Sequence, residues 1–457
     1  MRVAWDNLAE PADGAIAAVC GYALAAGSAR TASTFLLVPE ARCCAVHAPA
    51  DPSGAVEVFA AQPIPTRAGL LRLTGEWRVR TDDPTGWRYQ LHAARPLDPP
   101  GWQGVTRRRA LMAGPLMCLG VAAGSANAQD RQATAKAIIA AGPTIDIHSH
   151  AGGVANVKRI TIDIGYTPIA APMREGGMTA ICLAVVSDGP THHLEDKRIR
   201  PYRDPAAGEL YTYGMLAFDR VHALVKREGL RIVATRADLN AGTPGVVISA
   251  EGADFLEGRL ERVEEAYRRW TLRHLQLTHY RVNELGDIQT EPPVHGGLTD
   301  FGAEAIRCCN RLGIVVDVAH GTLDLVKRAA LVSTKPLVLS HTSLTARPGP
   351  HSRQISAEHA KVIAGTGGVI GVWPVADYYP TMTAMAVGMA RLADVVGVDH
   401  VGLGTDLRGL VGASTIGEYN ELPLLAEALL GAGFSQQDAG KILGGNYARV
   451  FAASLAL

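Results

Sequence analysis

From about residue 143 onward, short apolar runs alternate with helical stretches, and this pattern constrains the fold more than any other feature of the chain. The runs are nearly continuously apolar, which is typical of strands buried on both faces of a parallel sheet. There are eight of them: Thr144–His148, Thr179–Ser187, Val246–Glu251, Leu272–His279, Gly313–His320, Pro336–His341, Gly368–Trp373 and His400–Asp406. Helical patterns such as Arg259–Trp270 and Phe301–Leu312 lie between them, and a capping box at residues 435–438 predicts a late helix. Eight strand–helix units over roughly 315 residues predict an α/β fold, a (β/α)8 TIM-type barrel.

The composition excludes several classes of protein. Over 457 residues, 44 Lys and Arg balance 44 Asp and Glu, so the formal net charge is zero. The basic face that nucleic-acid binding needs is therefore not expected, and we predict no nucleic-acid partner. The seven cysteines include no CxxC spacing, which indicates neither a disulfide framework nor a zinc finger.

The barrel pattern leaves the first part of the chain unassigned. Residues 1–105 carry short β-like runs, such as Ser33–Val38 and Ala55–Phe59, separated by turn residues. They predict a small β-rich domain whose function the sequence does not indicate. Residues 131–457 are assigned to the barrel domain.

Residues 106–130, between these two domains, resemble an export signal of the twin-arginine (Tat) type. Arg107 and Arg108 precede an apolar stretch from Ala110 to about Gly124, and Ala126-Asn127-Ala128 supplies a small-residue cleavage site. The apolar stretch is about 15 residues long, short of the roughly 20 that a membrane-spanning helix needs. The competing interpretation is a buried apolar helix that joins two domains.

This segment predicts a location. We expect a product exported through the Tat route to the periplasm, or a membrane-anchored one if residues 106–128 are retained. Either the natural product begins near Val105, or residues 1–105 and the barrel form a genuine fusion.

Polar side chains gather at the ends of six predicted strands, and in a barrel of this type the carboxyl ends of the strands hold the active site. The residues at those ends are His148, His150, Glu251, His279, His320, His341 and Asp406. His148 and His150 are two residues apart, so on an ideal strand both rings point to one face. Small residues flank Glu251 and leave room for its carboxylate to bridge two ions. One such histidine alone would more often be a hydrogen-bonded core residue, but five histidines and two carboxylates together predict a metal site.

The other histidines near the barrel are not expected to take part. His192 and His193 lie in a polar loop and are expected to be solvated. His222 and His359 are expected on helix surfaces, and His274 in the core.

The sequence around the strand ends resembles the membrane dipeptidases, also called renal dipeptidases, which form peptidase family M19 among the metal-dependent amidohydrolase-like barrels. The resemblance covers roughly residues 143–453, in order. It rests on DIHSH (146–150), AEG (250–252), LQLTHYRVNELGD (275–287), GLTDFGAEAIRCCNRLGIVVDVAH (297–320), PLVLSHTS (336–343), SRQISAEHAKVIAGTGGVIGV (352–372), HVGLGTD (400–406) and GGNYARVF (444–451).

The resemblance implies a zinc-dependent metallodipeptidase that hydrolyses dipeptides, often with a D-amino acid at the C-terminal side. By position, His148 and His150 would bind one zinc ion and His320 and His341 a second one. Glu251 would bridge the two ions.

The resemblance also implies roles toward the substrate. His279 would bind the substrate and stabilise the transition state, and Arg353 would pair with the substrate carboxylate, with Arg347 as a nearby alternative. Asp406 would be the acid/base residue. Small peptides are the implied partners, and a homodimer is a further expectation.

The same residues support a mechanism on physical grounds. Two divalent ions that share a water lower its pKa toward neutrality and make hydroxide available to attack the peptide carbonyl. His279 is placed to donate to the developing oxyanion. Asp406 would take the nucleophile's proton and pass it to the departing amine. The planar, permanently charged fork of Arg353 suits a free carboxylate.

Two departures from the family pattern keep alternatives open. The family usually has His-x-Asp at the first strand, whereas this chain has His150, which makes the metal centre one unit more positive. The alternative is therefore a related binuclear hydrolase that acts on N-acyl amino acids, lactones or β-lactams, and a third hypothesis is a non-catalytic metal-binding barrel. Arg408 stands where the family often has Asp, and it either favours acidic substrates or faces water.

Overall fold

The computed structural model of the protein describes residues 12–24, 31–38, 55–65, 70–79, 89–96, 130–153, 167–196, 198–240 and 243–455. The chain divides into two compact units, Met1–Ala122 and Ala123–Leu457. The predicted export signal lies outside the described residues, except for its last residue, Asp130. Among the helices of the described part, none is both long and apolar enough to cross a membrane.

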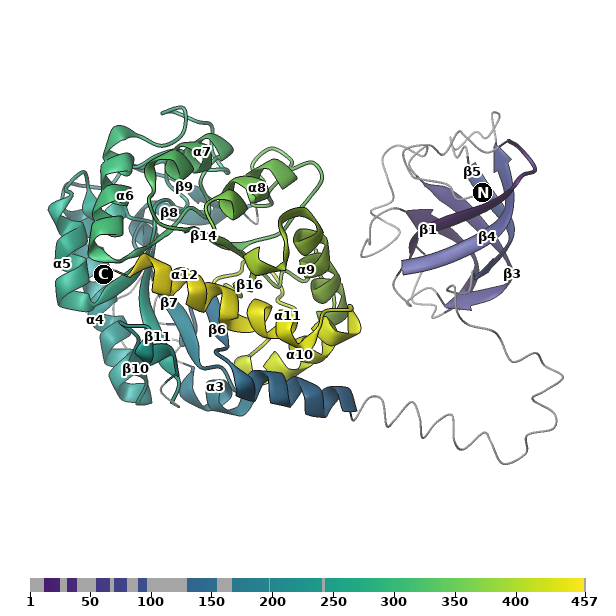
Figure 1. Ribbon diagram of the computed structural model, residues 1–457. Helices are drawn as coiled ribbons and strands as arrows, with labels where there is room; N and C mark the ends of the chain where they lie inside the picture. The colour runs from purple at the N-terminus through teal and green to yellow at the C-terminus, as the bar shows by residue number, and fades with distance from the viewer. Residues whose placement is uncertain are drawn as a thin grey trace. The chain divides into compact units, whose positions relative to one another are not determined.

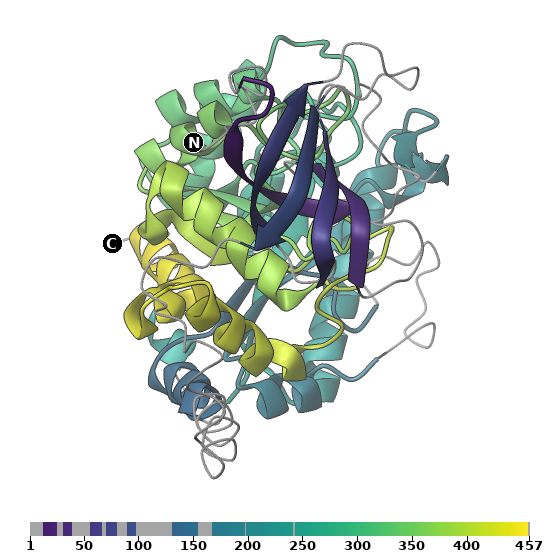
Figure 2. The ribbon, with the colours of Figure 1, turned by 90° about the vertical axis from the view of Figure 1, so that its right-hand side faces the viewer.

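The N-terminal unit is a small closed β-barrel. Figure 2 shows its strands as the purple and dark blue arrows. Its strands are β1 (Ile16–Leu24), β2 (Thr31–Val38), β3 (Val56–Pro65), β4 (Leu70–Val79) and β5 (Tyr89–Pro96). They are hydrogen-bonded in the order β1-β2-β3-β5-β4, and only β3 and β5 run parallel. Leu37, Val58, Leu73, Trp77 and Leu91 are fully buried between the strands. The β-rich character expected of this region is therefore observed.

The larger unit is a closed barrel of parallel strands surrounded by helices (Figure 1). The barrel strands are β6 (Ile145–Ser149), β7 (Ala180–Val186), β11 (Gly245–Glu251), β12 (Leu272–Gln276), β13 (Val315–Asp317), β14 (Leu337–Thr342), β15 (Val369–Val372) and β16 (Val401–Leu403). The pairing of β16 with β6 and of β7 with β11 closes the barrel. Each strand falls within or next to one of the eight predicted runs, so the predicted (β/α)8 barrel is confirmed.

Helices follow the strands and cover the outside of this barrel. They are α3 (Ala170–Gly176), α4 (Glu209–Glu228), α5 (Glu261–Trp270), α6 (Asp300–Leu312), α7 (Leu323–Val332), α8 (Ala357–Gly365), α9 (Met382–Val396), α10 (Leu422–Gly431), α11 (Gln436–Gly440) and α12 (Asn446–Ser454). The side chain of Ser435 accepts a hydrogen bond from the backbone N–H of Asp438 at the start of α11, as the capping box predicted. Residues 130–141 form a further helix before β6.

The larger unit has two smaller sheet elements besides the eight barrel strands. The short strand β10 (Arg231–Ile232) pairs with β11. The strands β8 (His192–Glu195) and β9 (Arg198–Pro201) form a hairpin in the connection between β7 and α4. This hairpin therefore follows a strand at the carboxyl end of the barrel, on the side where the polar strand-end residues lie.

Small residues inside the barrel let its strands approach at the level of the site. A Cβ added at Gly371 or at Gly404 would lie 1.8 Å from the backbone oxygen of Ser340. Only glycine fits at these two positions, because real Cβ atoms do not approach a backbone oxygen so closely. The close packing fixes Ser340 and, with it, the position of His341, the next residue in β14.

Hydrogen bonds between β6 and the segment after β16 fix the first and last strand ends relative to each other. The backbone N–H of Asp406 donates to the carbonyl oxygen of His148 (2.9 Å), and that of His150 donates to Leu407 (2.9 Å). The carboxylate of Asp146 accepts from the backbone N–H groups of both His148 and Thr405. These hydrogen bonds therefore join the first strand end, at His148 and His150, to the last strand end, at Asp406.

Candidate metal centre

All seven predicted strand-end residues meet in one buried cluster at the carboxyl end of the barrel. Each is at most 8% exposed. They come from six strand ends far apart in the sequence: His148, His150, Glu251, His279, His320, His341 and Asp406. The structure therefore brings together the whole set that the sequence pattern selected.

The carboxylate of Glu251 lies at the centre of this cluster. Its Oε1 is 3.2–3.4 Å from the Nε2 atoms of His148, His320 and His341. Its Oε2 is 3.0 Å from Nε2 of His150 and 3.2 Å from Nε2 of His279. Five imidazole nitrogens therefore converge on one buried carboxylate.

The histidines converge in the two pairs that the resemblance implies. Nε2 of His148 lies 3.2 Å from Nε2 of His150, and Nε2 of His320 lies 3.1 Å from Nε2 of His341. Two nitrogens bound at 2.0–2.1 Å to one tetrahedral zinc ion lie about 3.3 Å apart. The observed separations therefore suit one ion for each pair, with Glu251 between the pairs.

Backbone and side-chain groups hold several of these rings from behind. The hydroxyl of Ser340 lies 2.9 Å from Nδ1 of His341 and 3.4 Å from Nδ1 of His148. Nδ1 of His150 lies 3.1 Å from the carbonyl oxygen of Ala184. Such outer contacts leave each Nε2 facing the centre, which is the usual orientation of a metal-binding histidine.

The electrostatics of the cluster favour an ionised carboxylate and neutral imidazoles at His148, His320 and His341. Burial holds the pKa values of His320 and His341 well below their usual range and also lowers that of His148. Burial acts in the same direction on His150, but its hydrogen bond to Glu251 raises the pKa of this ring. Burial opposes ionisation of Glu251, but the nearby His279 and His148 hold its pKa well below the usual range. Neutral imidazole and ionised carboxylate are the forms that bind a divalent metal.

Two site residues adopt a backbone conformation that is uncommon outside glycine. His320 has φ +67° and Asp406 has φ +49°. The left-handed region costs most residues free energy, and such positions concentrate where a side chain must point in a required direction. Both backbones turn at the point where the strand ends, so that the side chains face the cluster.

Asp406 has the electrostatic properties of a proton-transfer group. Its Oδ1 lies 3.4 Å from Nε2 of His150. Burial raises the pKa of Asp406 to about 7, although His150 acts in the opposite direction. A carboxyl group that titrates near neutrality can take up and release a proton at little cost.

Arg353 lies beside the cluster, in the segment that follows β14. Its guanidinium donates to Oε1 of Gln289 (2.7 Å) and, through the other terminal nitrogen, to Nε2 of His341 (3.0 Å). Its Nε is buried and has no hydrogen-bond partner among the described residues. Arg347, the alternative carboxylate ligand, is exposed.

Arg408 is directed away from the cluster. It is exposed and forms an ion pair with Glu418, which offsets its charge. Of the two interpretations that the sequence left open, the structure favours an arginine that faces solvent.

Asp188 is a site residue that the sequence analysis missed. It is fully buried, and its Oδ1 accepts from Nδ1 of His279 (2.7 Å) and lies 3.3 Å from Nδ1 of His192. Its Oδ2 accepts from the backbone N–H of Tyr280 (3.0 Å). Burial raises the pKa of a carboxyl group, but His279 and His192 hold that of Asp188 below the usual range. An ionised Asp188 therefore fixes the ring of His279 with its Nε2 toward Glu251.

Two expectations about the remaining histidines were wrong. His192 is largely buried beside Asp188, because the β8–β9 hairpin folds back against the strand ends instead of extending into solvent. His359 is 4% exposed, because the short helix α8 turns this residue toward the barrel. His274 is buried in the core as expected.

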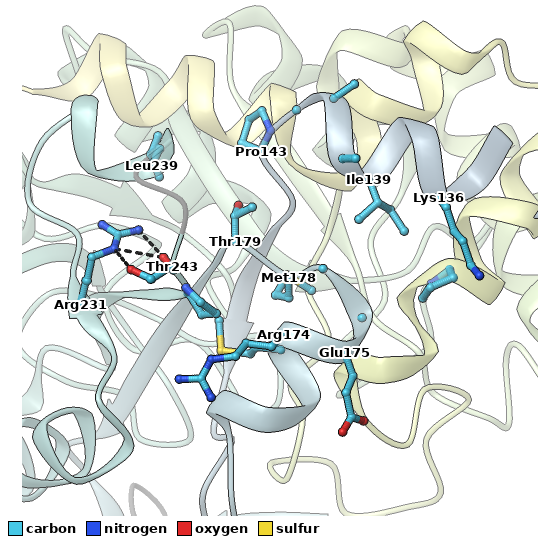
Figure 3. Close-up of a pocket in the computed structure, with 18 residues that line it drawn as sticks. Lys136, Ile139, Pro143, Arg174, Glu175, Met178, Thr179, Arg231, Leu239 and Thr243 are labelled. Atoms are coloured by element: carbon cyan, nitrogen blue, oxygen red, sulfur yellow. Dashed lines mark hydrogen bonds between the residues drawn. The ribbon is translucent and has the colours of Figure 1, made fainter. Parts of the chain in front are cut away.

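Two adjoining cavities open at the cluster, with volumes of about 610 and 290 Å³. Another cavity, of about 580 Å³, lies beside the residues that precede β6, β7 and β11 (Figure 3). That cavity is at the opposite end of the barrel, and none of the seven cluster residues lines it. The chemistry of this chain is therefore expected at the carboxyl end, where such barrels hold their active sites.

Known proteins resemble this chain in sequence and in fold. The family model described as membrane dipeptidase (peptidase family M19) matches residues 132–456. Dipeptidase aclJ of Aspergillus oryzae is 31% identical over 219 residues, which are 46% of this chain and 52% of that protein. The chain thus spans about half the length of this relative.

Solved structures share the fold. The probable dipeptidase PvdM from Pseudomonas aeruginosa has a TM-score of 0.60 at 17% identity, covering 71% of this chain and 98% of that one. A metallopeptidase from Rhodobacter sphaeroides, bound to a phosphinate mimic of L-Ala-D-Ala, has a TM-score of 0.58 at 20% identity, covering 68% of this chain and 99% of that one.

Replacement of Glu251 tests the cluster directly. We expect Glu251→Ala to weaken zinc binding by more than the roughly 10–100-fold that loss of an outer partner costs, because it removes the group on which all five imidazoles converge. Metal content after dialysis against a weak chelator measures this effect. Asp254→Asn is the matched control, since Asp254 is also a buried carboxylate but pairs with Arg281 and Asn283. Full zinc occupancy in Glu251→Ala would contradict a central role for this carboxylate.

Proposed function

Because this chain belongs to the membrane dipeptidase family, peptidase family M19, we propose that it is a zinc-dependent dipeptidase. The observation that carries the proposal is the convergence of four histidines, in two pairs, on the buried carboxylate of Glu251. We further propose that it cleaves dipeptides with a C-terminal D-residue, which the ligand of the Rhodobacter sphaeroides relative supports.

The donor set suits two zinc ions. His148 and His150 would hold one ion and His320 and His341 the other, with the carboxylate of Glu251 within reach of both pairs. When bound, such a pair of ions lowers the pKa of a shared water and polarises the scissile carbonyl. The neutral imidazoles, the ionised carboxylate and the spacing within each pair all fit this arrangement.

Asp406 is the proposed general acid and base. It borders both cavities, and its Oδ1 lies 3.4 Å from Nε2 of His150, so its carboxylate reaches the reacting centre. In the proposed reaction its carboxylate accepts the proton of the attacking water and then gives that proton to the departing amine.

His279 is the proposed donor to the carbonyl oxygen, and Asp188 is its positioning residue. His279 lines the smaller cavity together with Glu251 and His320. A hydrogen-bond donor aimed at a developing oxyanion typically contributes about 10²–10³ in turnover. The bond from Nδ1 of His279 to Asp188 keeps Nε2 toward the reacting centre. Donation from Nε2 to the carbonyl oxygen as well requires the imidazolium form, which carries a hydrogen on both nitrogens.

Arg353 is the proposed ligand of the substrate's C-terminal carboxylate. It lines the larger cavity and keeps a buried Nε without a partner among the described residues. A planar guanidinium binds a carboxylate through two parallel hydrogen bonds. Such a site would select short peptides, because the carboxylate must lie one residue from the scissile bond.

His150 keeps a second candidate function open. It stands where the family usually has an aspartate, and its Nε2 contacts both Glu251 and Asp406. The extra positive charge would suit substrates that lack a free amine, such as N-acyl amino acids, lactones or β-lactams. Export through the Tat route and assembly as a homodimer remain proposals from the sequence.

The first experiment is an assay of the zinc-loaded full-length protein on dipeptides and on their N-acetylated forms, each with D- or L-alanine at the C-terminus. We expect cleavage of the free dipeptides that a chelator abolishes and added zinc restores. Cleavage of only the N-acetylated forms would favour the second candidate. No cleavage of any substrate despite two bound zinc ions would contradict the proposal.

A second prediction concerns Arg353. Arg353→Met should lower kcat/KM about 30-fold or more for dipeptides with a free carboxylate, because a buried charged partner is lost. C-terminally amidated dipeptides should be affected far less. Arg347→Met, a change of an exposed arginine in the same segment, is the control and should leave both substrates unaffected. An equal loss on free and amidated substrates would reject carboxylate recognition by Arg353.

A third prediction concerns Asp188. Asp188→Asn should reduce kcat roughly 10-fold or more while KM and zinc content change little, because His279 loses the charge that orients it. Kinetics and metal analysis are compared with those of Asp254→Asn, which changes a buried aspartate that pairs with Arg281 and Asn283. Similar kcat losses in both variants would indicate a structural effect and reject the positioning role.

A further inference from the structure

The two cavities at the carboxyl end of the barrel share a wall. Leu194 and Ile199, which pair across the β8–β9 hairpin, line both cavities, and so do Tyr280 and the segment 409–411. Asp406 also borders both. The cavities are therefore two lobes of one space that meet beside the proposed acid and base.

Different functional residues line the two lobes. The smaller lobe, of about 290 Å³, is lined by His150, Glu251, His279 and His320, so the reacting centre lies there. The larger lobe, of about 610 Å³, is lined by Arg353. If Arg353 holds the C-terminal carboxylate, the C-terminal residue of a dipeptide occupies the larger lobe and the N-terminal residue occupies the smaller one.

The larger lobe has an apolar and aromatic wall. Its lining includes Tyr280, Trp373, Tyr378, Val375, Leu194 and Val411. Leu194 is 60% exposed, Val411 47% and Tyr378 41%, so three of the exposed large apolar side chains in the described part of the chain border this one space. Covering exposed apolar surface with an apolar ligand removes it from water and is favourable.

The charged groups of this lobe do not select a charged side chain. Arg198 donates to the carbonyl oxygen of Thr290 (3.0 Å), and His351 contacts the same oxygen (2.8 Å). Asp377 lies on the same lining and carries the opposite charge to Arg198. Among the described residues of the lining, Arg353 is assigned to the carboxylate and Asp406 to proton transfer, and the two other charged side chains, Arg198 and Asp377, are of opposite sign.

The smaller lobe leaves little room. Its volume lies at the lower end of ordinary small-molecule sites, and the metal ions, the attacking water and the scissile carbonyl must share it. Gly189 and Tyr213 also line it and are closely packed, since a Cβ at Gly189 would lie 2.6 Å from the hydroxyl of Tyr213. Only a small N-terminal side chain fits there.

We propose that this protein prefers dipeptides with a small N-terminal residue and a bulky apolar or aromatic C-terminal residue, whose side chain binds in the larger lobe. This inference rests on the proposed function and deepens it. It assigns a substrate class from the shape and chemistry of the two lobes.

Gly412 gives a direct test, because it lines the larger lobe and a Cβ added there would meet nothing within 4 Å. Gly412→Trp should fill the lobe without displacing the backbone. The matched control is Gly431→Trp, at the end of α10, where an added Cβ also meets nothing within 4 Å. Gly431 lines neither of the two lobes. Both full-length variants are assayed as zinc-loaded protein, with melting temperatures measured in parallel.

The substrates are Ala-Phe, Ala-Ala and Phe-Ala, with the C-terminal residue in both configurations. We expect the wild type to cleave Ala-Phe with a kcat/KM at least about 10-fold above that for Ala-Ala and further above that for Phe-Ala. Gly412→Trp should lower the ratio of Ala-Phe to Ala-Ala at least about 10-fold, and Gly431→Trp should leave it unchanged.

The outcomes separate this inference from the proposed function. Equal or reversed preference for Ala-Phe and Ala-Ala, or an unchanged ratio in a folded Gly412→Trp variant, would overturn the inference while leaving the dipeptidase activity in place. No chelator-sensitive cleavage of any of the three dipeptides would overturn both.

Discussion

The site depends on one ionised carboxylate held inside the protein. Glu251 is 3% exposed and lies within 3.4 Å of five imidazole nitrogens. A buried charge without compensation costs several kcal/mol. The surrounding imidazoles supply only partial compensation while they are neutral, and burial lowers the pKa values of His148, His320 and His341. Divalent cations between the carboxylate and the imidazoles would satisfy all of these groups at once, which is the physical reason why such a cluster suits a metal centre.

The barrel stabilises this arrangement because it fixes the backbone at each strand end. Glycines at 371 and 404 let the strands close around Ser340, whose hydroxyl faces the Nδ1 atoms of His341 and His148. One hydroxyl therefore touches a histidine of each pair. Asp146, in turn, accepts backbone hydrogen bonds from His148 and Thr405, which joins the first strand end to the last.

Much of the barrel fold and of the residue cluster could be predicted from the sequence, because burial and strand ends leave local patterns in it. Burial of both faces leaves a continuous apolar run in each barrel strand, so the eight strands were placed correctly. The residues of the cluster could be selected because each stands at or near the point where such a run stops. Asp188 follows the same rule at the end of β7, and a closer count of polar residues at strand ends would have found it.

The surroundings of His192 and the shape of the two lobes could not be predicted, because they depend on tertiary contacts that leave no local pattern in the sequence. His192 looked solvated because its neighbours in the sequence are polar, yet the hairpin packs it against Asp188. The sizes of the two lobes are set by the hairpin and by the segments around Arg353 and Gly412, which follow three different strands. Which residues face each other across these loops is decided only when the barrel closes.

In the proposed function, the contact between Arg353 and His341 would link metal binding to substrate recognition. A terminal nitrogen of Arg353 donates a hydrogen bond to Nε2 of His341. A metal ion bound by His341 would use the same lone pair of Nε2. One lone pair serves one partner, so the arginine and a metal ion compete for it. Metal binding at His341 would therefore free one guanidinium nitrogen beside the larger lobe, while the bond to Gln289 keeps the guanidinium in place. In the proposed dipeptidase, metal binding would therefore complete both halves of the site, the reacting centre and the carboxylate ligand.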